Sequence, residues 1–124
     1  MTATRLNNED SGWITLPLGS NAQAYDSGEV PVYRKHGPVV NLCGAVKPKS
    51  NVSAGGEFQI GTMPEGCRPN RQVATICQGS DNSVWLCRVY PAGGVWAQRY
   101  RSGSSSAAMT TSTWLPFNVT YITA

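Results

Sequence analysis

Residues 81 to 100 contain the densest group of side chains that could bind a ligand. Aromatic rings alternate there with polar and charged groups, in the set Asp81, Asn82, Trp85, Arg88, Tyr90, Trp96, Gln98, Arg99 and Tyr100. Aromatic faces stack on sugar rings, while short polar and charged groups bond the hydroxyls. The pattern predicts a carbohydrate-binding surface. Trp and Tyr also fill small β cores, so we expect at least one of Trp85 and Trp96 in the core or an interface.

Catalytic chemistry has no support in the sequence. Nearly all of the seven carboxylates fall in predicted turns, whereas a glycosidase needs two carboxylates held across the scissile bond. Asp26 with Glu29 or Asp81 are the pairs that could be imagined in that role, but Asp and Glu are common in turns. His36 is the single histidine and lies at a predicted strand end. We predict that the protein is not an enzyme.

The four cysteines predict neither a metal site nor a cofactor. They contain no Cys-x-x-Cys, and one histidine cannot complete a common zinc set. Cys77 and Cys87 could face each other across a hairpin centred near Asp81 and Asn82, close enough for a disulfide. The alternative is that they are small buried thiols.

Charge and hydropathy exclude two classes of partner. The net charge is +3, and no basic run is longer than Arg34-Lys35-His36, so no concentrated patch for nucleic acid is present. No apolar stretch approaches the roughly 20 residues that span a bilayer, and no secretory signal peptide is recognisable.

Short apolar runs separated by Gly and Pro predict an all-β protein, an antiparallel sandwich or barrel with no substantial helix. The clearest strand is the last, where Leu115, Phe117, Val119 and Tyr121 alternate with polar residues. The expected strands are residues 13–16, 32–36, 39–47, 57–62, 72–78, 83–90, 95–101 and 114–123.

The domain organisation is expected to be simple. Residues 1–11 lack apolar periodicity and are predicted to be a leader or the end of a connector, followed by one domain over residues 12–124. Because the chain ends on a strand, we expect a finished domain, with any larger parent protein upstream.

Two predicted strands, residues 39–47 and 84–90, carry apolar side chains on both faces. An antiparallel sheet in a small sandwich usually buries one face only. A long loop or another subunit should therefore cover the second face, and we expect a homo-oligomer.

Several segments together resemble the C-terminal receptor-binding (head) domains of tail-fibre and baseplate proteins from phages and prophages of Gram-positive bacteria. They are residues 12–18, 31–37, 40–46, 60–69, 94–100 and 114–121. In that family the 63–69 segment typically reads Leu-Pro-x-Gly-Tyr-Arg-Pro. Here Met63 and Cys67 replace the Leu and the Tyr.

The resemblance implies a jelly-roll-like β head, commonly a homotrimer, on a virion tail tip. It implies non-catalytic adhesion to host cell-wall polysaccharide or teichoic acid, and contacts with other tail proteins. It transfers no contact residues, and Arg34, Lys35 and Arg99 could serve trimer packing or internal ion pairing as readily as binding of an anionic polymer. The predicted ligand-binding residues are therefore Asp81, Asn82, Trp85, Arg88, Tyr90, Trp96, Arg99 and Tyr100. The alternatives are an assembly module of the baseplate or tail without a glycan site, and a stand-alone carbohydrate-binding module of a secreted hydrolase.

Overall fold

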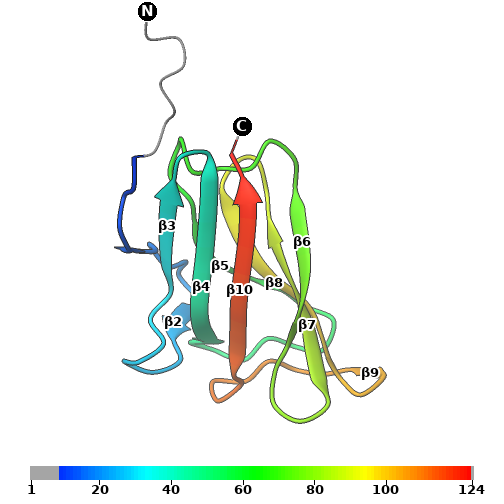
Figure 1. Cartoon of the computed structure of the whole chain (residues 1–124). Coiled ribbons are helices and arrows are strands. Elements are labelled where there is room, and N and C mark those ends of the chain that lie inside the picture. Colours follow the sequence, from blue (N-terminus) through cyan, green and yellow to red (C-terminus); the bar gives the residue numbers. More distant parts are fainter. Residues whose placement is uncertain (1–8, 124) are drawn as a thin grey trace, which may run out of the picture.

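The structure is a computed structural model that describes residues 9 to 123 as two packed antiparallel sheets (Figure 1). Sheet A has the order β1-β3-β4-β10, with β2 paired to β4; its strands are β1 (Ile14–Thr15), β2 (Ala22–Ala24), β3 (Val32–His36), β4 (Val39–Pro48) and β10 (Leu115–Ile122). Sheet B has the order β5-β8-β7-β6, with β9 paired to β8; its strands are β5 (Phe58–Thr62), β6 (Val73–Gln78), β7 (Ser83–Val89), β8 (Gly94–Ser102) and β9 (Ser105–Ser106). No helix occurs in residues 9–123, and the predicted all-β fold is confirmed.

Two short strands that we did not predict, β2 and β9, lie in segments that we expected to be loops. β2 pairs with the far end of β4, where Ala22 is opposite Pro48. β9 folds back on β8, where Ser105 is opposite Ser102. Strands of two or three residues are too short to show a period of two, so their partners rather than their own sequence define them.

The core lies between the sheets, and the closing strand contributes as predicted. Leu115, Phe117, Val119 and Tyr121 are buried, while the residues between them face outward. The Trp85 ring of sheet B meets the Phe117 ring of sheet A edge to face, with centroids 6.1 Å apart. This contact joins the two sheets at the centre of the core.

One side of the sandwich is closed by backbone hydrogen bonds between the sheets. The segment after β1 runs along β5, where Leu18 bridges Gly61 and the Gly19 N–H donates to the Ile60 carbonyl at 2.8 Å. On the opposite side the edge strands β6 and β10 pack against each other without pairing, and a single bridge joins Pro69 to Thr123 beyond their ends. The architecture is therefore a sandwich with one barrel-like side.

Both ends of the described chain meet at the turn between β3 and β4. The Gly37 N–H donates to the Glu9 carbonyl at 2.9 Å, and the Thr123 N–H donates to the Pro38 carbonyl at 2.8 Å. Residues 9–11, which we assigned to the leader, thus lie beside β3, and the Ser11 N–H donates to the Lys35 carbonyl. The rest of the predicted leader, residues 1–8, lies outside the described residues.

The two strands with apolar residues on both faces are covered differently. On β4, Ala45 is buried beside a segment of the same chain, since its N–H donates to the Glu29 carbonyl at 2.9 Å. On β7, Val84 and Leu86 are only half-buried, and their neighbour Ile76 on β6 is 77% exposed. The segment before β3 therefore covers the second face of β4 at Ala45, while Val39 on that face is exposed and the second face of β7 is only partly covered by the described residues.

The cross-strand disulfide left open by the sequence does not form. Cys77 is opposite Trp85 and Cys87 is opposite Thr75, so the two cysteines are diagonal neighbours, about 7–8 Å apart rather than directly paired. Both are free thiols. Burial raises the pKa of the Cys77 thiol to about 11 and also raises that of Cys87, as the buried-thiol alternative expects.

Candidate functional site

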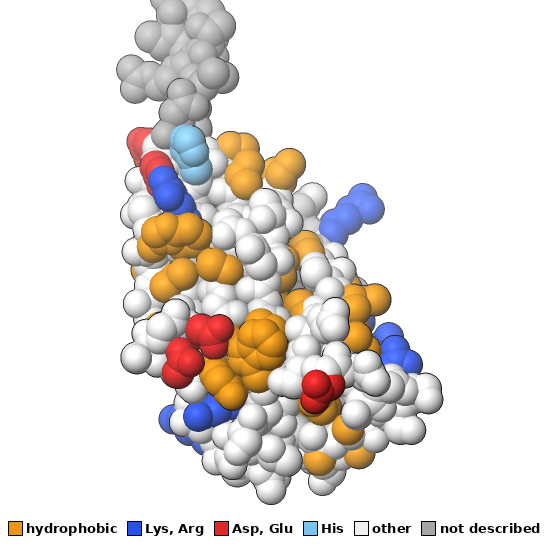
Figure 2. All heavy atoms as spheres, turned by 60° about the horizontal axis from the view of Figure 1, so that its bottom comes forward, with side chains coloured by type: hydrophobic (Ala, Val, Ile, Leu, Met, Phe, Trp, Pro, Cys, Tyr) orange, Lys and Arg blue, Asp and Glu red, His pale blue; other side chains and the backbone are white. Residues whose placement is uncertain are grey.

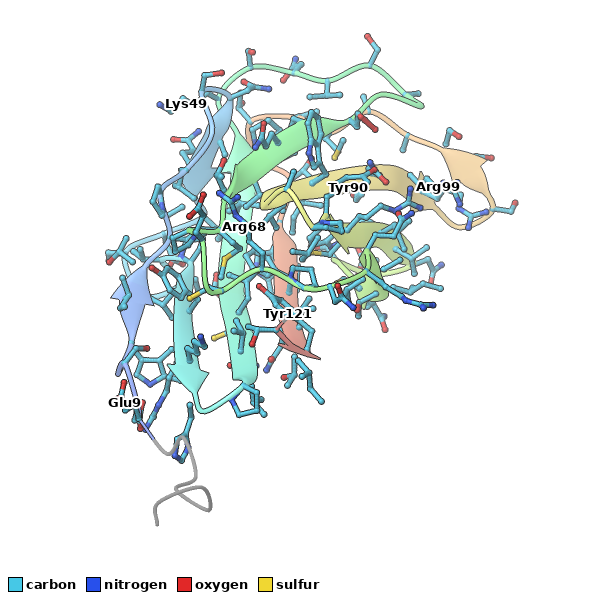
Figure 3. The ribbon with its side chains drawn as sticks, turned by 90° about the horizontal axis from the view of Figure 1, so that it is seen from above. Glu9, Lys49, Arg68, Tyr90, Arg99 and Tyr121 are labelled. Carbon is cyan, nitrogen blue, oxygen red and sulfur yellow. The ribbon has the colours of Figure 1, made fainter. Side chains whose placement is uncertain are left out.

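The outer face of sheet B gathers three of the predicted ligand-binding residues. Successive side chains of β7 point alternately into the core and outward, and Arg88 is on the outer face. There it lies directly opposite Trp96 of β8. Gln59 of β5 is opposite Trp96 on the other side, and Tyr90 follows β7 with the same parity as Arg88. Figure 3 shows Tyr90 over sheet B, on the other side of the molecule from Glu9. We call Arg88, Tyr90 and Trp96 with Gln59, Gln98 and Glu57 the sheet B cluster.

A buried amide holds the polar groups of the sheet B cluster in place. Gln98 is only 7% exposed, and its Nε2 donates to the Glu57 Oε1 at 3.0 Å and to the Tyr90 hydroxyl at 3.3 Å. The Gln98 amide, and secondly the Arg88 guanidinium, lower the pKa of the Tyr90 hydroxyl. The carboxylate and the phenol are thus fixed before any ligand arrives.

The Trp96 ring is also positioned by its neighbours. A Cβ at Gly94 would lie 2.8 Å from Trp96 Nε1, so the indole extends over a site that only glycine leaves open. The ring remains half-buried. Among residues 9–123, the buried Nε of Arg88 has no hydrogen-bond partner, so the protein does not fully use that guanidinium.

Asp81 and Asn82 lie at the other end of β7, in the turn from β6. Their carbonyls hold the turn: the Gly103 N–H donates to Asn82 and the Gln78 amide donates to Asp81. The seven residues of β7 separate this turn from Tyr90 by about 23 Å at ~3.3 Å per residue. The structure therefore does not bring the predicted residues together in one site.

A bulge separates Arg99 from Tyr100. The β7–β8 register shifts between Val84 and Leu86, and Arg99 takes a φ of 54° there. Tyr100 consequently packs against the core, while Arg99 is exposed. Arg99 and Arg101 line a shallow hollow together with Ile76, Val84, Trp85 and Leu86.

Trp85, one of the predicted ligand-binding residues, lies in the core. Its side chain is 1% exposed and packs on Phe117. The expectation that one of the two tryptophans belongs to the core is confirmed.

The sequence reasoning did not single out a second aromatic group, at the lower end of sheet A. Tyr25 follows β2, and Trp114 precedes β10; their ring centroids are 6.5 Å apart. The two residues are far apart in the sequence, and each stands alone in a predicted loop or strand end. The one feature of the sequence that could have drawn attention to Tyr25 and Trp114 is that each is a large aromatic residue in an otherwise polar segment.

Arg34 is used within the protein. It forms an ion pair with Asp10 and lies 5.7 Å from the centroid of the Trp13 ring. The hydrogen bond from Arg34 is the main cause that lowers the pKa of Asp10 to about 2. Arg34 therefore takes part in internal ion pairing, one of the roles left open by the sequence.

Residues 9–123 contain no group of three or more His, Cys, Asp or Glu side chains that could hold a metal ion. In the same residues, no helix is long and apolar enough to cross a membrane.

The fold is similar to that of a phage protein. The head domain of the lactococcal phage bIL170, described in connection with a common fold for receptor-binding domains of lactococcal phages, superimposes with a TM-score of 0.64 and 18% sequence identity. The match covers 90% of this chain and 97% of that domain. No family model and no curated protein matches the sequence. The head-domain fold implied by the resemblance is confirmed.

Proposed function

We propose that this chain is a non-catalytic adhesion domain of a phage or prophage tail, which recognises a glycan on the host cell surface. The observation that carries the proposal is the similarity to the bIL170 head domain over 90% of the chain. The sheet B cluster supports a glycan ligand, because it combines a half-buried aromatic ring on the outer face with fixed hydrogen-bonding groups. The domain would act at the tail tip of the virion.

Wall polysaccharide or teichoic acid suits the charges near this cluster. Arg88 lies beside Trp96 on the outer face, and its buried Nε has no hydrogen-bond partner among the described residues. A guanidinium pairs well with phosphate or carboxylate groups. A polymer of sugars and phosphodiesters offers both a ring for Trp96 and an anion for Arg88.

The Trp96→Ala variant should bind cells at least about tenfold more weakly, because it removes the stacking surface at the centre of the cluster. The assay is fluorescently labelled protein on Gram-positive cells, before and after extraction of wall polysaccharide. Trp13→Ala is the matched control, since Trp13 is 52% exposed but lies at the edge of sheet A. Equal staining by a folded Trp96→Ala variant would contradict this location of the site.

We also propose that the chain assembles as a homotrimer through the open part of sheet B. Ile76, Val84 and Leu86 form an apolar patch there that residues 9–123 leave partly exposed, on the edge strand β6 and its neighbour β7. Assembly would cover this patch and would raise weak single-site affinities through avidity.

Sedimentation equilibrium should give the mass of three chains for the wild type and of one chain for Ile76→Lys, which places a charge in the patch. Ile122→Lys is the control, because Ile122 is 67% exposed on sheet A, and it should remain a trimer. A monomeric wild type would favour a stand-alone carbohydrate-binding module. A trimer that binds no cells would favour the assembly module, which the apolar patch also fits.

A further inference from the structure

The lower end of sheet A carries an aromatic corner whose polar partners are already in place. The Trp114 Nε1 donates to the Glu29 Oε2 at 3.2 Å, and the Lys47 Nζ lies 5.3 Å from the centroid of the Tyr25 ring. With the edge-to-face contact of the two rings, these four residues form one group, which we call the Tyr25–Trp114 corner.

The backbone of three strands fixes the corner. Tyr25 is held to β4, since its N–H donates to the Ala45 carbonyl at 2.9 Å. Glu29 is held to the same residue from the other side, because its carbonyl accepts the Ala45 N–H. Lys47 lies on β4 opposite Gln23 of β2, and Trp114 leads directly into β10. The sheet therefore fixes the backbone from which the four side chains of the corner extend.

The corner is open to solvent. Tyr25, Glu29, Lys47 and Trp114 are all half-buried, and the neighbouring Asp26 is exposed. Figure 2 looks onto this end of the molecule and shows apolar side chains with acidic and basic groups beside them. Both ends of the described chain bond to the β3–β4 turn at the opposite end of β10, about 26 Å away at ~3.3 Å per residue, so neither covers the corner.

Structural packing alone does not require this combination. Two aromatic rings that served only the core would be buried, as Trp85 and Phe117 are. Here the rings stay half-exposed, and a carboxylate and an ammonium group flank them. A rigid aromatic surface with a fixed acceptor and a fixed donor binds a hydroxyl-rich ring at low entropic cost.

We propose that the Tyr25–Trp114 corner is a second saccharide subsite, which takes an uncharged pyranose ring. The ring would stack on the exposed aromatic surface, while its hydroxyls would donate to the Glu29 carboxylate and accept from Lys47. Glu29 and Asp26 disfavour a phosphate at this place, in contrast to Arg88 in the sheet B cluster. This proposal rests on the proposed function in one respect only: the sugar is taken to come from the host cell surface.

The test is a titration followed by the indole N–H signals in proton–nitrogen NMR spectra, with the Trp114 signal assigned from Trp114→Phe. The probes are the methyl glycosides of glucose, galactose and rhamnose, N-acetylglucosamine, and glycerol phosphate, each at millimolar concentration. At least one of the neutral sugars should shift the Trp114 signal saturably, and glycerol phosphate should not. The Trp13 signal, from an exposed tryptophan elsewhere on sheet A, is the internal control.

Two conservative variants separate binding from packing. Glu29→Gln keeps an acceptor for the Trp114 indole but removes the charge, and Lys47→Met keeps the length of the side chain but removes the donor. Each should weaken the saturable shift by about three- to tenfold. No saturable shift with any neutral sugar, or a shift unchanged in both variants, would overturn the proposal. If the wild-type domain bound no cells but its Trp114 signal still shifted saturably with a neutral sugar, this result would count against the proposed function alone.

Discussion

Replacing Trp85 with alanine should lower the free energy of unfolding by about 3–5 kcal/mol. The indole is 1% exposed, and its ring meets Phe117 across the two sheets, so the substitution leaves a cavity at the centre of the core. Urea denaturation followed by circular dichroism measures the change.

Two variants test the physical origin of this loss. Trp85→Phe should cost less than Trp85→Ala, because phenylalanine keeps an aromatic ring in the core and leaves a smaller cavity. Removal of the indole Nε1 breaks no hydrogen bond, since this buried atom has no partner among the described residues. Trp96→Ala should change stability by less than about 1 kcal/mol, because Trp96 lies on the outer face. A loss below about 1 kcal/mol in Trp85→Ala would contradict the central place of this ring.

The strands could be predicted where one face is clearly apolar. β10 is the best case, since Leu115, Phe117, Val119 and Tyr121 are buried and Asn118 faces outward as the period of two requires. β7 could be located but not oriented, because Val84 and Leu86 oppose Trp85 and Cys87 with equal hydrophobicity. The packing of Trp85 on Phe117, a residue of a distant strand, decides which face is buried.

The site could be predicted less well, because closeness in the sequence differs from closeness on a sheet. Successive residues point to opposite faces and advance about 3.3 Å, so a hairpin spreads one aromatic-rich segment over two faces and two ends. Trp85 and Tyr100 turn inward, and Asp81 lies far from Tyr90. Tyr25 and Trp114 come together only because β2 and β10 both pair with β4.

Replacing Gly44 with alanine should destabilise the domain by about 3 kcal/mol or more. Gly44 lies in β4 with a φ of 144°, which L side chains rarely adopt, and a Cβ there would lie 2.5 Å from the Pro31 Cα. The position of the added Cβ is set by its own backbone, and the Pro31 Cα is a backbone atom, so no side-chain rotation can relieve the strain. Urea denaturation measures the loss.

The same substitution should also open the Tyr25–Trp114 corner, because the Cβ would push away the segment that carries Glu29. The Trp114 indole signal should then move toward the position it has in an unfolded chain, even under conditions where the domain remains folded. Gly28→Ala is the matched control in that segment: its Cβ would meet only the Asp26 Oδ1, at 3.4 Å, and its φ is not positive. If Gly44→Ala were as stable as Gly28→Ala and left the indole signal unchanged, the close approach of β4 to Pro31 would not be what positions the corner.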